Sequence, residues 1–339
     1  MKPSLKDFRD QYRESLLGFL WRQWSALGVA GHAKTADPWI VDPDALLLFT
    51  ATIGRHDARL FDEVLDWLQA NGTFINVKRV KRIQQAEGFA GLPVLASIAA
   101  VIGRGADTLK WKSLAEAVEP SKSRQSLFFQ PDYKPMPALK EPDERFARFG
   151  LLRDKPALRG YSQEFRPNEQ TTLALQLRAL FGVNARSEIL QYLLTHEAAH
   201  PADIARQTYY FKKTIQDALV DMHRSGVVEI RTFGREKHYW IKPEPWAVLL
   251  NRAAEEKMPS WITWPAVFAV LERVWLRLQE PSVHAADALM VSTELRQLLS
   301  EIRPAVEKAG FPMNMLSRRQ YVGEEFVETF LSDMHTILR

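Results

Sequence analysis

The stretch from residue 184 to residue 242 limits the possible folds of this chain more than any other. Apolar residues recur at helical spacing in residues 185–196, and Pro201 predicts the start of a short second helix because proline is tolerated in a first helical turn. Residues 210–224 predict a third helix with one buried apolar stripe, formed by Ile215, Ala218, Leu219 and Met222. Two short β-type runs around Gly234 follow, and they predict a β-hairpin.

Three helices followed by a hairpin resemble the winged helix-turn-helix domain of MarR-like and ArsR-like bacterial regulators. Ala202–Thr208 is similar to the second helix and turn of that family, and Ser225–Val228 is similar to the start of its wing. The family's recognition-helix pattern falls on Lys212, Lys213, Thr214, Ile215, Ala218 and Leu219. The resemblance covers about 60 of the 339 residues, and it implies a DNA-binding transcriptional regulator without catalytic activity.

The resemblance also implies which side chains meet DNA. In this family the third helix lies in the major groove, where Lys can donate to guanine and Gln can pair with adenine, and the wing approaches the phosphates or the minor groove. We therefore expect contacts from Tyr210, Phe211, Lys212, Lys213, Thr214 and Gln216 in the helix, and from Arg231, Arg235, Lys237 and His238 in the wing.

Three residues depart from the family pattern. The family often has Gly and Ser where this chain has Tyr209 and Phe211, so we expect an unusual turn and the loss of a serine cap. Asp217 would repel phosphate, although it can also accept a hydrogen bond from cytosine. The alternative hypothesis is a winged helix that docks a protein through the aromatic cluster of Tyr209, Tyr210 and Phe211.

Residues 196–200 spell HExxH, the signature of zinc metallopeptidases, with His196, Glu197 and His200. The zinc site needs a continuous helix through both histidines. Pro201 would break that helix at a cost of about 3 kcal/mol or more, and it biases His200 away from helical angles. A zinc hydrolase is therefore the least favoured hypothesis, and we expect neither a metal nor a cofactor.

Composition sets broad limits on the kind of protein. A net charge of +4 and a pI of about 9.1 are compatible with nucleic acid, and the absence of cysteine excludes disulfides and cysteine-bound metals. We see no secretory signal and no apolar run near the roughly 20 residues that span a bilayer. We expect a cytoplasmic protein without membrane association.

The flanking sequence predicts a mainly helical protein. We expect a helical N-terminal domain (1–118), a proline-rich connector (119–170), the winged helix-turn-helix (171–242) and a helical C-terminal domain (243–339). Polar residues directly before apolar helical patterns predict N-caps at Asp42, Asp57, Asn76 and Asn168. The family further implies a homodimer, and a small molecule or a protein could act as effector.

A second basic segment precedes residue 83. Val77, Val80 and Ile83 predict the inward face of a helix. Its cations, Lys78, Arg79, Lys81 and Arg82, are expected to point outward. They form either a solvated face, which we favour slightly, or a second surface for DNA phosphates.

Overall fold

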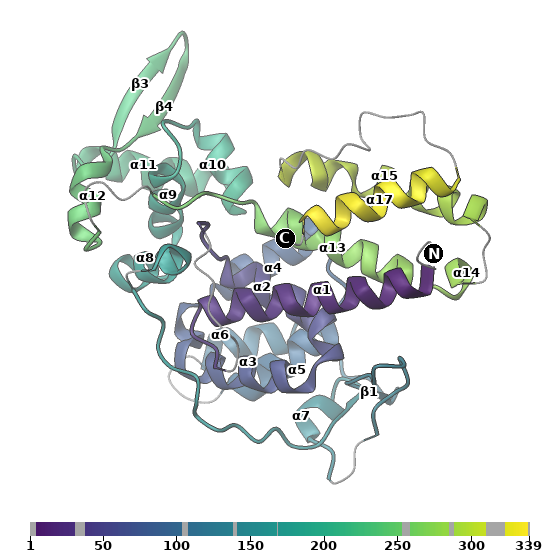
Figure 1. Ribbon diagram of the computed structural model, residues 1–339. Helices are drawn as coiled ribbons and strands as arrows, with labels where there is room; N and C mark the ends of the chain where they lie inside the picture. Colours follow the sequence, from purple (N-terminus) through teal and green to yellow (C-terminus); the bar gives the residue numbers. More distant parts are fainter. Residues whose placement is uncertain are drawn as a thin grey trace.

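The computed structural model is mainly helical, as predicted, with a few short strands (Figure 1). It describes residues 5–30, 38–103, 108–137, 141–167, 169–252, 258–284, 288–309 and 323–337.

The N-terminal helices are α1 Leu5–Ala26, α2 Pro43–Ile53, α3 Ala58–Asn71, α4 Val77–Glu87, α5 Leu92–Ile102 and α6 Thr108–Ala115. Three predicted N-caps are confirmed. The Asp42 carboxylate accepts from the backbone N–H groups at the start of α2, and Asp57 and Asn76 do the same for α3 and α4. Asn168 lies outside the described residues.

The connector folds against the N-terminal helices. It contains α7 Glu144–Ala147 and two short parallel strands, β1 Gln125–Ser126 and β2 Leu151–Leu152. Phe128, Phe146 and Phe149 are buried in the same hydrophobic cluster as α1–α6. Its prolines prevent long helices without keeping its aromatic residues out of the core.

A central unit follows, and its helices are α8 Leu173–Phe181, α9 Ala185–Leu194, α10 Pro201–Thr208, α11 Lys212–Arg224 and α12 Pro243–Leu249. Strands β3 Glu229–Phe233 and β4 Glu236–Trp240 form an antiparallel hairpin, and Ala199 pairs with Tyr239 at the side of β4. This unit has its own hydrophobic cluster, with side chains from α8 to α12. The predicted helices and hairpin are present, although the first ends at Leu194 and the third begins at Lys212.

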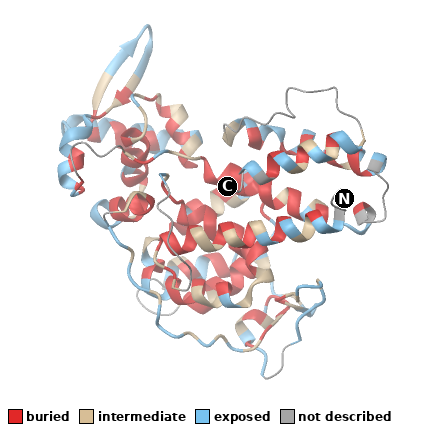
Figure 2. Ribbon diagram, viewed as in Figure 1, coloured by how far each residue is buried: buried red, intermediate tan, exposed pale blue. Residues whose placement is uncertain are grey.

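The remaining described helices are α13 Trp264–Leu278, α14 Pro281–His284, α15 Ala288–Ala309 and α17 Glu324–Ile337. Helices α13, α15 and α17 share one hydrophobic cluster with α1–α6 (Figure 2). Phe49 of α2 stacks on Phe268 of α13 with ring centroids 4.8 Å apart. We call α1–α6 together with α13, α15 and α17 the helical body, because segments from both ends of the sequence fill one core.

None of the described helices is both long enough and apolar enough to cross a bilayer.

Candidate nucleic-acid interface

Helix α11 is amphipathic, and its outer face is polar. Ile215, Ala218, Leu219 and Met222 are buried, as the sequence pattern predicts. The predicted contact residues Lys212, Lys213, Thr214 and Gln216 are all exposed. Lys213 Nζ lies 3.3 Å from the Asp217 carboxylate one turn later, so Asp217 partly neutralises a neighbouring lysine.

The start of α11 has no side-chain cap. Phe211 occupies the N-cap position in an extended conformation, and its side chain makes no capping hydrogen bond. This confirms the loss expected from replacing serine. The Phe211 side chain is 68% exposed and lies beside the two lysines at the start of the helix.

The hairpin projects away from the rest of the molecule (Figure 1). Gly234 has a φ of +61° at its tip, a conformation that a residue without Cβ adopts readily. Arg231, Arg235 and Lys237 are exposed along the hairpin. The Arg231 guanidinium of β3 lies 4.2 Å from the centroid of the Trp240 ring of β4, so the two side chains contact each other across the hairpin.

His238 differs from the other predicted wing contacts because it is only half-exposed. Its ring lies 5.2 Å from that of Phe233 and 5.9 Å from that of His200. Its Nε2 is 3.5 Å from the Glu236 carboxylate. These contacts give His238 a packing role between the hairpin and the loop that precedes α10.

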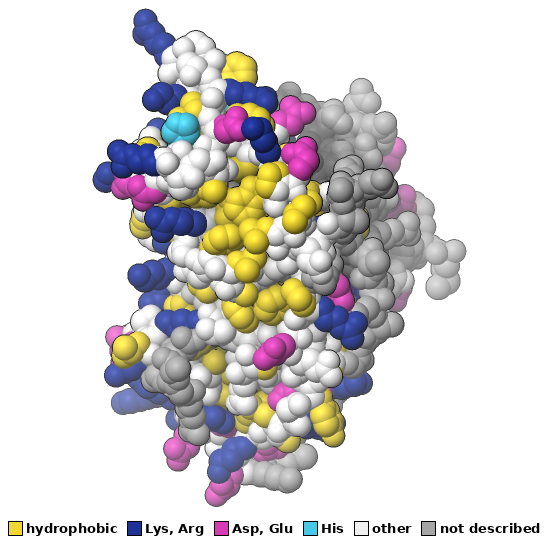
Figure 3. Space-filling model, turned by 90° about the vertical axis from the view of Figure 1, so that its left-hand side faces the viewer, with side chains coloured by type: hydrophobic (Ala, Val, Ile, Leu, Met, Phe, Trp, Pro, Cys, Tyr) yellow, Lys and Arg dark blue, Asp and Glu magenta, His cyan; other side chains and the backbone are white. Residues whose placement is uncertain are grey.

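One side of the molecule carries both charged and apolar groups. Figure 3 shows Lys and Arg side chains along one edge, from the top of the molecule downward, and an apolar patch in the middle. Exposed apolar side chains of the central unit include Leu180 and Phe181 of α8 and Val248 and Leu249 of α12. This face therefore offers surfaces of two different kinds.

Tyr210 is held by the helical body. Its hydroxyl accepts a hydrogen bond from Asn76 Nδ2 at 2.5 Å, and the Arg82 guanidinium lies 4.3 Å from its ring centroid. Burial raises the pKa of Tyr210 to about 12. The polar group of Tyr210 is thus already engaged with the helical body, whereas Lys213 pairs within α11 itself.

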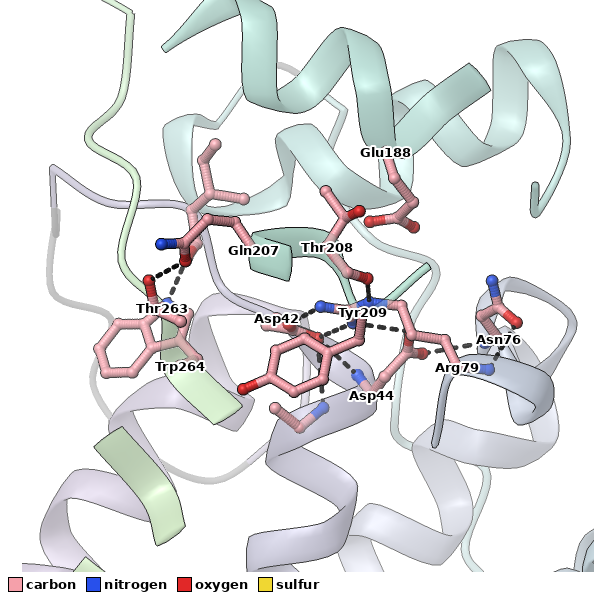
Figure 4. Close-up of polar contacts among 12 residues, drawn as sticks. Asp42, Asp44, Asn76, Arg79, Glu188, Gln207, Thr208, Tyr209, Thr263 and Trp264 are labelled. Atoms are coloured by element: carbon pink, nitrogen blue, oxygen red, sulfur yellow. Dashed lines mark hydrogen bonds and ion pairs between the residues drawn. The ribbon is translucent and has the colours of Figure 1, made fainter. Parts of the chain in front are cut away.

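Tyr209 is an anchor, and its ring is buried in the cluster of the helical body (Figure 4). Its hydroxyl donates to the Glu87 carboxylate and accepts from Lys308 Nζ, which lies 2.7 Å away. The Lys308 ammonium also contacts Glu87 at 2.7 Å. The three aromatic residues therefore do not form one exposed docking cluster, because Tyr209 is buried, Tyr210 is half-buried and Phe211 alone is fully exposed.

Arg79 corrects the prediction of four outward cations on α4, since only 1% of it is exposed. Its guanidinium contacts Asp42 at 2.6 Å and Asp44 at 2.9 Å, and its Nε donates to the Thr208 carbonyl at 2.9 Å (Figure 4). Burial disfavours the charged form of Asp42, but Arg79 and Arg178 outweigh burial and hold its pKa below the usual range. Arg79 thus joins the body to the turn before α11 and cannot belong to an outer basic surface.

Arg178 of α8 continues this buried network. It contacts Asp44 and Glu188 at 2.7 Å each, and all three side chains are buried. Charges alternate from α2 and α4 of the body to α8 and α9 of the central unit. Helical periodicity does not predict this network, although an arginine inside the apolar helix pattern LALQLRALF is a sequence signal for a buried charge.

The other three cations of α4 stay toward the outside. Lys78 is exposed, and Lys81 is half-exposed, with Nζ donating to the Ser113 carbonyl at 2.6 Å. Arg82 Nε donates to the Tyr209 carbonyl at 2.6 Å, and its guanidinium lies 5.6 Å from the Phe211 ring centroid. Arg82 therefore lies directly beside the start of α11.

The HExxH motif does not lie on a helix. Helix α9 ends at Leu194 and α10 begins at Pro201. His196 stacks on Tyr192 with ring centroids 3.8 Å apart, whereas His200 caps α10 and its Nδ1 accepts from the Ala202 N–H. Across the described ranges no three His, Cys, Asp or Glu side chains group to hold a metal ion. The geometry that a zinc hydrolase needs is not formed at this motif.

No protein-family model, curated protein or solved structure matches the chain.

Proposed function

We propose that the protein binds double-stranded DNA and regulates transcription, with α11 in the major groove and the β3–β4 hairpin on the backbone. The observation that carries this proposal is the exposed polar face of α11, with Lys212, Lys213 and Gln216 beside the cationic hairpin. The element order, including the short pairing of Ala199 with Tyr239, supports the resemblance to MarR-like and ArsR-like regulators.

The two surfaces suit different parts of a duplex. Lysine and glutamine side chains at the start of a helix reach base edges and can distinguish guanine and adenine. Arg231, Arg235 and Lys237 suit phosphates, because each neutralised phosphate releases counterions and strengthens binding at low salt. By the same resemblance the protein would act in the cytoplasm as a homodimer on paired half-sites.

The first experiment measures fluorescence anisotropy with a duplex selected from a random pool, with a scrambled duplex as reference, across a salt series. Replacing both lysines, Lys212→Ala/Lys213→Ala, should abolish the preference for the selected duplex, because these side chains would read its bases. The matched control Lys134→Ala/Lys155→Ala removes the same charge from exposed positions of the connector and should keep the preference. Unchanged affinity and preference in the α11 variant would contradict the proposal.

A protein-docking module is the second candidate, and the exposed apolar side chains of α8 and α12 favour it. Contiguous exposed apolar surface often marks a protein interaction site. This reading predicts weak duplex binding without sequence preference. It also predicts that Val248→Asp/Leu249→Asp impairs binding of a protein partner while DNA binding stays as it is.

A further inference from the structure

The start of α11 lies against α4 of the helical body. Asn76, the N-cap of α4, donates to the Tyr210 hydroxyl at 2.5 Å. Arg82, in the second turn of α4, donates to the Tyr209 carbonyl and lies over the Tyr210 ring. The residues that lead into α11 are therefore in direct contact with α4.

The charged side chains of α4 are almost all positive. Besides the buried Arg79, three of its first six residues are cations, Lys78, Lys81 and Arg82. Its one acidic residue, Glu87, is buried against Tyr209 and Lys308. Neither α4 nor α11 has an acidic residue in its first turn. Cations near a helix N-terminus oppose the helix dipole. Since this placement does not help the helices form, a bound anion is a physical reason for it.

The positive charge continues onto α6, which packs beside α4. Lys81 donates to the Ser113 carbonyl of α6, and Lys110 donates to the Thr73 carbonyl just before α4. Lys112 is well exposed and lies 3.7 Å from Glu116. We call Lys78, Lys81, Arg82, Lys110 and Lys112 the basic band. Figure 3 shows Lys and Arg side chains along much of one edge of the molecule, interrupted by acidic and apolar side chains.

We propose that the basic band binds the phosphate backbone of duplex DNA next to the site that α11 reads. This inference rests on the proposed function and extends it, because it assigns part of the DNA interface to the helical body. Duplex DNA is the fitting partner because the band adjoins the start of α11, and because flexible lysine side chains suit phosphates without reading sequence. The protein would then cover more DNA than α11 and the hairpin can reach.

The test compares duplexes of two lengths with the same central selected sequence, about 20 and about 40 base pairs. The variant is Lys78→Ala/Lys81→Ala/Lys112→Ala, in the full chain. On the long duplex, the slope of log affinity against log salt should become shallower by roughly 2 to 3 per bound protomer, because about 0.9 is lost per phosphate contact. On the short duplex the variant should match the wild type. A double variant, Lys78→Ala/Lys112→Ala, keeps the Lys81–Ser113 contact and should show about two thirds of the effect.

The control is Lys6→Ala/Lys134→Ala/Lys155→Ala, which removes three exposed lysines from α1 and the connector and should leave both slopes unchanged. Equal slopes for the band variant and the wild type on the long duplex would overturn this inference and leave the proposed function standing. A loss of equal size on both duplexes would overturn it as well. Failure of the wild type to bind any duplex would overturn the proposed function itself. Binding of poly-glutamate as tight as binding of the long duplex would assign the band to an acidic protein segment instead.

Discussion

Glu272 lies within α13 with its carboxyl buried against the loop between α4 and α5. The Ala90 N–H donates to its Oε2 at 3.1 Å. Burial raises the pKa of Glu272 to about 7 from an ordinary value of 4.5, although the Ala90 hydrogen bond and the Arg273 charge oppose the shift. The folded protein therefore holds this proton at a pH where the unfolded chain has already released it.

The sign of the pH dependence follows from that raised pKa. The stability that the proton contributes is fully present below pH 4.5 and is lost as pH rises through about 7. Glu272→Gln keeps the shape without the charge, so it should match the wild type at low pH and exceed it above neutrality by up to roughly 3 kcal/mol. Urea unfolding followed by tryptophan fluorescence at about pH 5 and about pH 8 measures the difference.

A charge-matched control separates this effect from general charge removal. Glu325→Gln removes a carboxylate from an exposed position on α17. Its effect on the free energy of unfolding should stay within about 0.5 kcal/mol at both pH values. A Glu272→Gln protein that gains nothing between the two pH values would show that Glu272 is charged in the folded state.

At the scale of elements, the junction between α4 and the turn before α11 depends on charges that have no access to water. Arg79 lies between Asp42 and Asp44 and also reaches the Thr208 carbonyl. A buried ion pair adds little net stability compared with a pair of apolar side chains. Removing one partner, however, leaves the other charge buried and unpaired. The network therefore fixes where the central unit sits on the body.

Arg79→Met should lower the free energy of unfolding by about 3–5 kcal/mol, because Asp42 would lose its closest cation and Asp44 one of two. Lys78→Met, one residue earlier on the exposed face, changes the same charge and should cost less than about 0.5 kcal/mol. Urea midpoints of the two variants make the comparison. Equal midpoints would mean that the network does not hold the junction.

The same helix shows what the sequence can and cannot predict. The N-caps Asp42, Asp57 and Asn76 were predictable because capping depends on residues two or three positions away. Periodicity also placed the apolar stripe of α11 correctly. Periodicity failed for Arg79, because α4 is covered by other helices of the body and, in addition, by the turn of the central unit. The second covering surface lies far away in the sequence.

The candidate site was predictable only where it depends on local sequence. The exposure of Lys212, Lys213 and Gln216 follows from their place opposite a local apolar stripe. The burial of Tyr209 does not follow, because its partners Glu87 and Lys308 come from both ends of the chain. Tyr209 has a φ of 58°, a conformation that is uncommon for a residue with a bulky side chain, and its contacts with the body hold it there.

At the scale of the whole molecule, one core joins helices from both ends of the sequence. Side chains of α1 and α2 pack against α13, and Trp264 Nε1 donates to the Ile40 carbonyl at 2.6 Å. The sequence pattern predicts separate domains at residues 1–118 and 243–339, because the helical periodicity degrades after residue 118 and a distinct unit lies between them. Helical periodicity predicts which face of a helix is buried, but it does not predict which other helix covers that face.

Ending the chain after Arg252 should unfold the helical body and spare much of the central unit. The truncation removes α13, α15 and α17 and uncovers Phe19 and Phe49, which pack on α13, whereas α9–α11 keep their own cluster. Hydrogen exchange should become fast in α2 and α5 and stay slow in α9 and α11. Protection of α2 and α5 at full-length levels would contradict a shared core.

The place of α13 in the sequence also orders events during synthesis. Helix α2 finds its covering helix only after the entire central unit has been translated. A nascent chain would therefore complete the central unit first. Until α13 is synthesised, the apolar faces of the earlier helices that pack against it would stay exposed. Transiently exposed apolar surface of this kind promotes aggregation and is bound by chaperones. Slow elongation between residues 250 and 264 would lengthen that exposure, so the yield of folded protein depends on translation speed there.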